Sequence, residues 1–310
     1  CTAVATPCAL AQDFPNKTVR IVVPFAPGGA TDVLARITAQ KVAEQFGRQL
    51  ILDNRPGAGS VIDTDMVAKA AADTVKRVHQ ELGGKSPNIV LPGSDLPAVL
   101  PATVSGVFIN SGQSCISPAR ILVHKDQEAE AVSVIKNLMA SVPVGDPLQE
   151  GGHIGPVVNK TQYEKIQGLI QSGIDEGATL ETGGTGLPAN VNRGYYVKPT
   201  VFSGVTPDMR IAREEIFGPV AAVMTYADLD EAIEIANDTE YGLSAVISGD
   251  PAKAASVAPQ LRAGMVAINA WGPTPGTPFG GYKQSGNGRE GGLFGLKDFM
   301  EVKSISGLPA

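Results

Sequence analysis

The chain has 310 residues, of which 43% are hydrophobic and 18% are charged, as is typical of a globular protein long enough for two domains. This composition excludes a disordered or fibrous chain, and three cysteines are too few for a disulfide framework. The net charge of −6 argues against nucleic-acid binding, and the lack of an apolar run of about 20 residues argues against a membrane span.

Residues 1–11 are uncharged and rich in small side chains, and the first residue is Cys1 rather than methionine. Ala9-Leu10-Ala11 fits the small residues at the end of a secretory signal, so we expect residues 1–11 to be the remnant of a leader whose true start lies upstream. The alternative interpretation is a terminus without fixed structure and without a targeting role.

The segment from residue 12 to residue 70 is predicted to form a β-α-β unit. Val19–Val23 is β-branched and mostly apolar, which favours a strand. Thr31 can cap a helix whose apolar residues share one face as far as Phe46, and Gly47 then ends that helix. Residues 49–52 are predicted to form a second strand. Because strands joined through a helix pair in parallel, we expect these two strands to lie side by side.

The loops of this segment carry a distinctive pattern, with "PGGATD" after the first strand and "DNRPGAG" after the second. They resemble the start of the periplasmic substrate-binding proteins of tripartite tricarboxylate transporters. The resemblance implies that Gly28, Gly29 and Asp32 face a carboxylate ligand. Free N–H groups at a helix N-terminus favour an anion, which agrees with this role. A tight turn leading into a helix explains the same glycines without a ligand.

From about residue 71 the chain alternates predicted strands and helices, which favours an α/β domain. The predicted strands span residues 88–91, 119–123, 196–202, 221–225, 243–248 and 265–269. The predicted helices span residues 96–110, 127–141, 161–173, 228–237 and 251–261. A structured glycine-rich loop is expected over residues 270–292, and the tail Phe299 to Ile305 alternates like a strand.

Cys115 is the only cysteine outside the expected leader, and it follows the glycine-flanked turn at residues 111–114. We expect this polar turn to keep the thiol accessible, whereas a lone cysteine is most often a buried small residue. A nucleophilic cysteine needs a lowered pKa or a neighbouring base. Glu81 begins the apolar, glycine-rich text "ELGGKSPNIV", where burial can raise its pKa and make it a general base.

Other chemistries have weaker signals. His79, His124 and His153 form no local protease or metal signature, so a Cys–His hydrolase stays an alternative that needs tertiary contacts. No helix-spaced pair of metal ligands is found, and no metal is expected. Lys85 could be an anion ligand, but we expect it to be an exposed lysine at a strand end.

Four longer motifs occur in the order found in the aldehyde dehydrogenase superfamily, namely "ELGGKSPNIV", "NSGQSC", "EEIFGPV" and "PFGGYKQSGNGREGG". The resemblance covers about residues 71–307. It implies that Cys115 is the nucleophile and Glu81 the general base. It also implies that Glu215 and Phe217 contact the nicotinamide ribose and ring of NAD or NADP, and that Leu82 and Gly83 belong to the same cofactor site.

The reaction implied by this resemblance is the oxidation of a small aldehyde to a carboxylic acid. The Cys115 thiolate attacks the aldehyde carbonyl, and backbone N–H groups near Cys115 hold the resulting oxyanion. Loss of hydride to the cofactor leaves a thioester, and Glu81 activates the water that hydrolyses it. The cofactor is expected to be NAD or NADP, with no preference between them.

The expected fold class is α/β, an aldehyde-dehydrogenase-like catalytic domain with a truncated nucleotide-binding domain, preceded by a β-α-β unit. The expected boundaries are a leader remnant at 1–11, the transporter-like segment at 12–70 and the end of a nucleotide-binding domain at 71–83. A catalytic domain at 84–292 and a C-terminal oligomerisation strand at 293–310 complete the chain.

This organisation predicts an impaired enzyme, since the family's nucleotide-binding half lies upstream of "ELGG", where the transporter-like segment stands. The alternatives are a periplasmic carboxylate-binding protein and an inactive hybrid fragment. We expect a homo-oligomer that binds neither nucleic acid nor membrane. A cytoplasmic location is favoured because the body has no disulfide pattern, and a periplasmic one holds if the leader functions.

Overall fold

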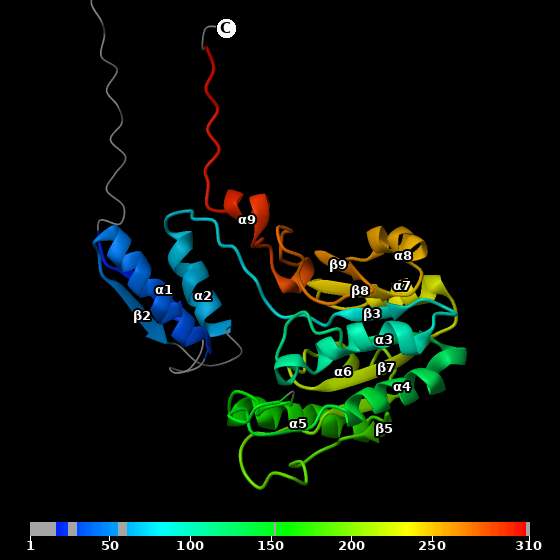
Figure 1. Cartoon of the computed structure of the whole chain (residues 1–310). Helices are drawn as coiled ribbons and strands as arrows, with labels where there is room; N and C mark the ends of the chain where they lie inside the picture. Colours follow the sequence, from blue (N-terminus) through cyan, green and yellow to red (C-terminus); the bar gives the residue numbers. More distant parts are fainter. Residues whose placement is uncertain (1–16, 24–29, 55–60, 152, 308–310) are drawn as a thin grey trace, which may run out of the picture. The chain divides into compact units, whose positions relative to one another are not determined.

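The computed structural model describes residues 17–23, 30–54, 61–151 and 153–307 (Figure 1). The chain divides into two compact units, Cys1–Val78 and His79–Ala310. The expected leader and the glycines Gly28 and Gly29 of the first loop lie outside the described residues.

The first unit contains the predicted β-α-β arrangement. Its elements are β1 (Val19–Val23), α1 (Ala30–Phe46), β2 (Leu50–Asn54) and α2 (Val61–Ala72). Strands β1 and β2 pair in parallel, with Val19 opposite Leu50 and Val23 opposite Asn54, so the predicted pairing is confirmed.

Asp32 lies in the first turn of α1 and is 2% exposed. Its carboxylate accepts hydrogen bonds from Arg36 Nε at 2.8 Å and from Asn54 Nδ2 at 2.9 Å. These contacts connect the start of α1 to the end of β2, so Asp32 has a structural role within the unit.

The second unit is built around a seven-stranded sheet in the order β5-β6-β7-β4-β3-β8-β9. Only the β5–β6 pair is antiparallel, and the other pairs are parallel. The strands are β3 (Pro87–Val90), β4 (Arg120–His124), β5 (Thr179–Thr182), β6 (Thr200–Ser203), β7 (Val220–Tyr226), β8 (Ser244–Ser248) and β9 (Met265–Ile268). The α/β class predicted from alternating strands and helices is therefore confirmed.

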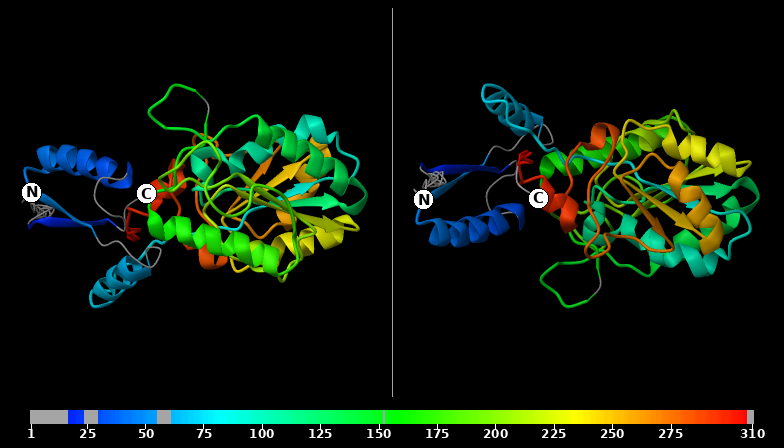
Figure 2. Two further views of the ribbon diagram at one scale, coloured as in Figure 1. Left: turned by 90° about the horizontal axis from the view of Figure 1, so that it is seen from below. Right: turned by 90° about the horizontal axis from the view of Figure 1, so that it is seen from above.

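Helices cover both faces of this sheet, as the views in Figure 2 show. They are α3 (Leu96–Val104), α4 (Glu128–Ala140), α5 (Lys160–Asp175), α6 (Arg210–Arg213), α7 (Leu229–Asn237) and α8 (Pro251–Val257). The short helix α9 (Gly292–Lys297) does not belong to these layers, and its apolar side chains are exposed. One apolar core joins the sheet to α5, α6, α7 and α8, and a second joins the opposite face to α3 and α4. The central strands are mostly apolar because both of their faces are buried.

A buried arginine connects the sheet to α7. Arg120, the first residue of β4, is 1% exposed. Its guanidinium donates to the carbonyl oxygens of Lys85 at 3.0 Å and of Ile235 and Ala236 at 2.9 Å each. Ile235 and Ala236 lie in the last turn of α7, where carbonyl groups have no partner within the helix. Arg120 therefore satisfies the C-terminal end of α7 from inside the protein.

Several predicted elements differ in extent from the structure. The predicted helix at 96–110 ends at Val104, and 3-10 turns follow in which Asn110 and Ser111 adopt positive φ angles of 53° and 58°. The predicted strand at 196–202 is reduced to β6. Short strand β5 and helix α6 were not predicted, because four residues carry too little periodicity.

The predicted strand in the tail does not form within this chain by itself, and its pairing with a second copy stays a prediction. Residues 301–307 have no regular secondary structure, and Phe299 is 90% and Val302 100% exposed. A strand needs a neighbour to receive its backbone hydrogen bonds, and the described part of the chain offers none to the tail. Among the described residues no helix is long and apolar enough to cross a membrane.

Candidate functional site

The site begins with the extended segment Gln80–Lys85, which the glycine-rich loop holds along its length. Leu82 N–H donates to the Ser285 carbonyl at 3.0 Å, and Ser285 Oγ donates to the Gly83 carbonyl at 2.7 Å. Gly288 N–H donates to the Gln80 carbonyl at 2.9 Å. Because these bonds hold the backbone on both sides of Glu81, the position of that side chain is set by residues about 200 positions away.

The Glu81 carboxyl group lies in a partly buried position. Its Oε1 atom is buried and has no hydrogen-bond partner among the described residues. Burial raises the pKa of Glu81 to about 7, and the negative charges of Glu290 and Glu215 raise it further. A carboxyl group with this pKa can both accept and return a proton near neutral pH.

Gly83 and Gly84 bring three of the sequence motifs together. A Cβ atom on Gly83 would overlap the Glu215 carboxylate, and one on Gly84 would overlap the Cys115 carbonyl oxygen. Gly84 N–H donates to Glu215 Oε1 at 3.0 Å. Gly84 is therefore required by space, since a side chain there would push the Cys115 backbone away, and a side chain on Gly83 would displace the Glu215 carboxylate.

The Cys115 thiol is half-buried and is the free cysteine of the described chain. Its pKa is raised to about 12, first by burial and then by the charges of Glu81 and Glu215. The backbone N–H groups of Cys115 and Ile116 act in the opposite direction and lower it. The turn leaves the thiol half-buried beside two carboxylates, so of the two conditions for a nucleophile it has a neighbouring carboxylate and not a lowered pKa.

Glu215 and Phe217 occupy the turn before β7. Glu215 is partly buried, and burial raises its pKa. Phe217 has a φ angle of 55°, a left-handed conformation that is strained for a non-glycine residue. The side chain of Gln162 in α5 donates to the carbonyls of Ile216 at 3.0 Å and Phe217 at 2.9 Å, which holds this conformation.

Lys85 is buried, which corrects the prediction of an exposed lysine. It is 3% exposed, and its Nζ has no hydrogen-bond partner among the described residues. Burial, with a further contribution from Arg120, lowers the pKa of Lys85 to about 7. A lysine at a strand end is usually solvated. Nothing in the local sequence indicates that Arg120 and the end of helix α7 lie beside Lys85.

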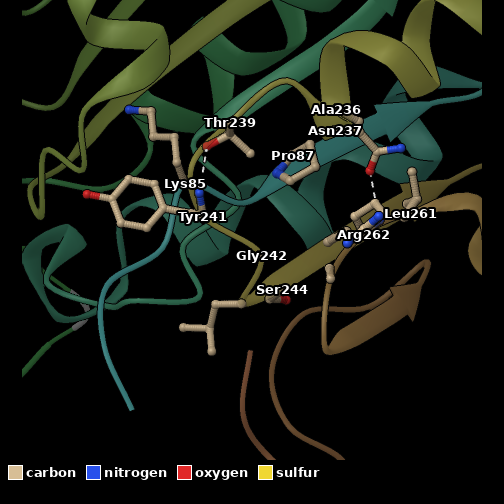
Figure 3. Close-up of a pocket in the computed structure, with 13 residues that line it drawn as sticks. Lys85, Pro87, Ala236, Asn237, Thr239, Tyr241, Gly242, Ser244, Leu261 and Arg262 are labelled. Carbon is tan, nitrogen blue, oxygen red and sulfur yellow. Dashed lines mark hydrogen bonds between the residues drawn. The ribbon is translucent and has the colours of Figure 1, made fainter. Parts of the chain in front are cut away.

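A small cavity with a volume of about 10 Å³ lies beside Lys85 (Figure 3). Tyr241, Gly242 and Arg262 are among its lining residues, and in Figure 3 the Lys85 side chain points away from Asn237 and Arg262. Neither Cys115 nor Glu81 lines it. The cavity is therefore separate from the cysteine and glutamate cluster.

The structure thus brings Cys115, Glu81, Gly83 and Glu215 together. Leu82 and Phe217 belong to the same two segments as Gly83 and Glu215. Sequence reasoning assigned no role to four residues that contact the site: Gln162, Trp271, Ser285 and Glu290. Ser285 and Glu290 lie within a quoted motif, whereas the contacts of Gln162 and Trp271 are made across the fold and leave no local signal. The three histidines do not gather at the thiol, since His79 pairs with Asp298 and His124 bonds the Ala227 carbonyl. Within the described residues no group of three or more His, Cys, Asp or Glu is arranged to hold a metal ion.

The sequence model described as "Aldehyde dehydrogenase family" matches residues 45–305. The chain therefore belongs to the aldehyde dehydrogenase family. The family match begins at residue 45, whereas the resemblance of the motifs begins at about residue 71. Nothing found tests the resemblance of residues 12–70 to transporter binding proteins, which stays a prediction.

Known proteins of the family are similar to this chain in sequence and in structure. A 3-succinoylsemialdehyde-pyridine dehydrogenase from Pseudomonas sp. is 47% identical over 250 residues, which are 80% of this chain and 52% of that protein. A mutant of aldehyde dehydrogenase C from Pseudomonas syringae, in complex with NAD+ and octanal, is 40% identical with a TM-score of 0.82. That superposition covers 93% of this chain and 63% of the other.

An aldehyde dehydrogenase from Mycobacterium tuberculosis complexed with NAD+ is 35% identical, also with a TM-score of 0.82. The superposition covers 94% of this chain and 63% of that protein. The chain spans about half the length of the curated relatives it matches. The shared fold extends over most of this chain and over a smaller share of each relative.

Proposed function

We propose that this chain oxidises an aldehyde to a carboxylic acid, with NAD as the hydride acceptor, Cys115 as the nucleophile and Glu81 as the general base. One observation carries the proposal. The Glu81 and Glu215 carboxylates lie close enough to the Cys115 thiol to raise its pKa, and the Gly83–Gly84 backbone packs against Glu215 and Cys115.

The proton balance of this cluster supports the assignment of roles. Both carboxylates oppose a negative charge on Cys115, so the site disfavours a thiolate beside an ionised Glu81. Transfer of the thiol proton to Glu81 keeps the total negative charge of the pair at one while the sulfur becomes a nucleophile. Because its pKa is near 7, Glu81 can release that proton to solvent, and the regenerated carboxylate can then take a proton from the water that attacks the thioester.

The residues around Glu215 fit the nicotinamide end of a dinucleotide. The Glu215 carboxylate offers two acceptor oxygens to the hydroxyl groups of a ribose, and the neighbouring Gly83 has no side chain. Leu82 directly precedes it in the same segment. Phe217 follows on the same turn and offers an apolar ring. When bound, NAD would accept the hydride from the substrate. The preference for NAD over NADP rests on the NAD+ complexes of similar proteins.

The tail provides support for a homo-oligomer. Phe299, Val302 and Ile305 are apolar and exposed, with exposed fractions of 90%, 100% and 67%. A segment of this kind gains strand structure only by pairing with another chain. We propose that the C-terminal region assigned to residues 293–310 pairs with a second copy through the exposed tail that follows helix α9. Residues 71–83 are assigned to the end of the nucleotide-binding domain and residues 84–292 to the catalytic domain.

The test is a calorimetric titration of the whole purified chain with NAD, followed by aldehyde-dependent NADH formation. We expect saturable NAD binding and turnover that Cys115→Ser abolishes. The matched control, Ser114→Ala, changes the neighbouring residue of the same turn and should keep most of the activity. No NAD binding together with no NADH formation would overturn the proposal.

Hydrolysis of an activated ester distinguishes loss of the cofactor from loss of the nucleophile, because acylation of the thiol needs no NAD. Ester hydrolysis that depends on Cys115 without NAD binding would show a working nucleophile in an impaired dehydrogenase. Equal ester hydrolysis by wild type and Cys115→Ser would remove Cys115 from its proposed role.

A further inference from the structure

Trp271 connects the glycine-rich loop to the turn that carries the thiol. It is the only tryptophan of the chain, and it follows β9 by three residues. Its indole Nε1–H donates to the carbonyl oxygen of Ile116 at 3.0 Å. Ile116 is the residue directly after Cys115 and is itself 7% exposed. The contact joins residues that are 155 positions apart in the sequence, so no local sequence pattern predicts it.

The indole ring rests on a glycine. A Cβ atom on Gly106 would lie 2.5 Å from two atoms of the Trp271 ring, closer than real side chains approach. Gly106 is in the 3-10 turn Ser105–Val107 after α3 and has no positive φ angle that would call for glycine. Space for the ring is therefore the reason for glycine here, and the ring is held between this turn and the Cys115 turn.

The base of the Trp271 segment is fixed by the sheet. Asn269 has a φ angle of 52°, and its side chain makes two hydrogen bonds of 2.7 Å with the backbone N–H and carbonyl of Gly249 after β8. Asn269 N–H also donates to the Ile247 carbonyl at 2.9 Å. Two residues later the chain reaches Trp271, so the ends of strands β8 and β9 set the position of the indole.

The two consecutive peptide groups after the thiol are thus each in contact with a distant segment. Gly84 packs against the Cys115 carbonyl oxygen, and Trp271 holds the Ile116 carbonyl oxygen. The orientation of this stretch decides where the Ile116 N–H group points. That N–H group and the N–H group of Cys115 stabilise the ionised thiol.

We propose that Trp271 is a positioning residue for Cys115, which holds the Ile116 backbone so that its N–H group faces the thiol sulfur. The inference rests on the proposed role of Cys115 as nucleophile. It assigns no contact with substrate to Trp271. Gly106 is the partner of the tryptophan, because it leaves room for the ring.

The test uses the alkylation rate of Cys115 by iodoacetamide in the full chain, with Cys1→Ser and Cys8→Ser as background so that one thiol remains. Trp271→Phe keeps a ring on Gly106 but removes the donor. Gly106→Ala keeps the donor but displaces the ring. We expect both to slow alkylation about threefold to tenfold between pH 7 and 9.5, since an ionised thiol loses a hydrogen bond.

A matched control is Tyr282→Phe, which removes a polar atom from the same glycine-rich loop and should leave the alkylation rate unchanged. Trp271 emission provides an independent signature, because Gly106→Ala should shift it to longer wavelength as the ring is displaced. A purely structural role predicts the opposite sign, since a loosened fold exposes the thiol and speeds alkylation. Unchanged or faster alkylation in both variants, with the unfolding transition retained, would overturn the inference.

This experiment separates the inference from the proposed function, because alkylation needs neither aldehyde nor NAD. Slowed alkylation in a chain that does not oxidise aldehydes would support the positioning role and reject the dehydrogenase activity. Normal alkylation in the Trp271 and Gly106 variants of an active enzyme would reject the positioning role alone.

Discussion

The substitution Glu81→Gln should make the second unit more stable above neutral pH while removing the proposed general base. The pKa of Glu81 is raised to about 7 from an ordinary value of 4.5, chiefly by burial. As pH rises from 4.5 towards 7, the unfolded chain loses this proton first, and folding stability falls. Glutamine has nearly the same shape and no charge, so this loss is absent in the variant.

The size of the effect follows from the raised pKa. A change from 4.5 to about 7 corresponds to about 3 kcal/mol at 1.36 kcal/mol for each pH unit. The side chain is only partly buried, so solvent screening reduces this figure to about 1–2 kcal/mol. The difference in the free energy of unfolding between Glu81→Gln and wild type should therefore grow by about 1–2 kcal/mol from pH 5 to pH 8.

Urea unfolding followed by tryptophan fluorescence measures this difference, because the chain's only tryptophan, Trp271, lies in the second unit. The control is Glu240→Gln, which removes an exposed carboxylate and should show no growth with pH. A difference that stays constant from pH 5 to pH 8, or that shrinks, would refute the argument that burial of Glu81 sets its pKa.

Two further predictions concern the buried cations. Arg120→Met should destabilise the second unit by about 2–4 kcal/mol, because three buried carbonyls lose their donor; a urea midpoint equal to that of wild type would contradict this. Lys85→Met should stabilise the unit, with a larger gain at pH 6 than at pH 9.5. The folded pKa of Lys85 lies below its unfolded value, so burying the amine costs most at low pH. An equal gain at both pH values, measured by urea unfolding, would count against a buried charged amine.

The sequence was sufficient for the elements with long and regular patterns. The β-α-β unit and the strands at β3, β4, β7, β8 and β9 were predicted close to their observed bounds, because β-branched runs and helical periodicity act over a few neighbouring residues. The order of the motifs was also sufficient to predict the family, since four long motifs in the same order rarely occur together outside it. The short elements β5 and α6 carry too few residues for any such signal.

The chemical state of the site was not readable from the sequence. The glycine-flanked turn predicted an accessible thiol, yet Cys115 is half-buried beside two carboxylates and its pKa is raised to about 12. The neighbours that raise it, Glu81 and Glu215, come from segments 34 residues before and 100 residues after it. A pKa depends on charge and burial in three dimensions, and no local pattern records them.

By itself the sequence determined which residues carry chemistry and which backbone segments form strands and helices, because those properties belong to residue types and their spacing. Only the tertiary structure decided that Lys85 is buried, that Trp271 holds the backbone after Cys115, and that the tail has no strand partner within the described chain. These are contacts between distant segments, and packing of the sheet and its helices alone brings such segments together.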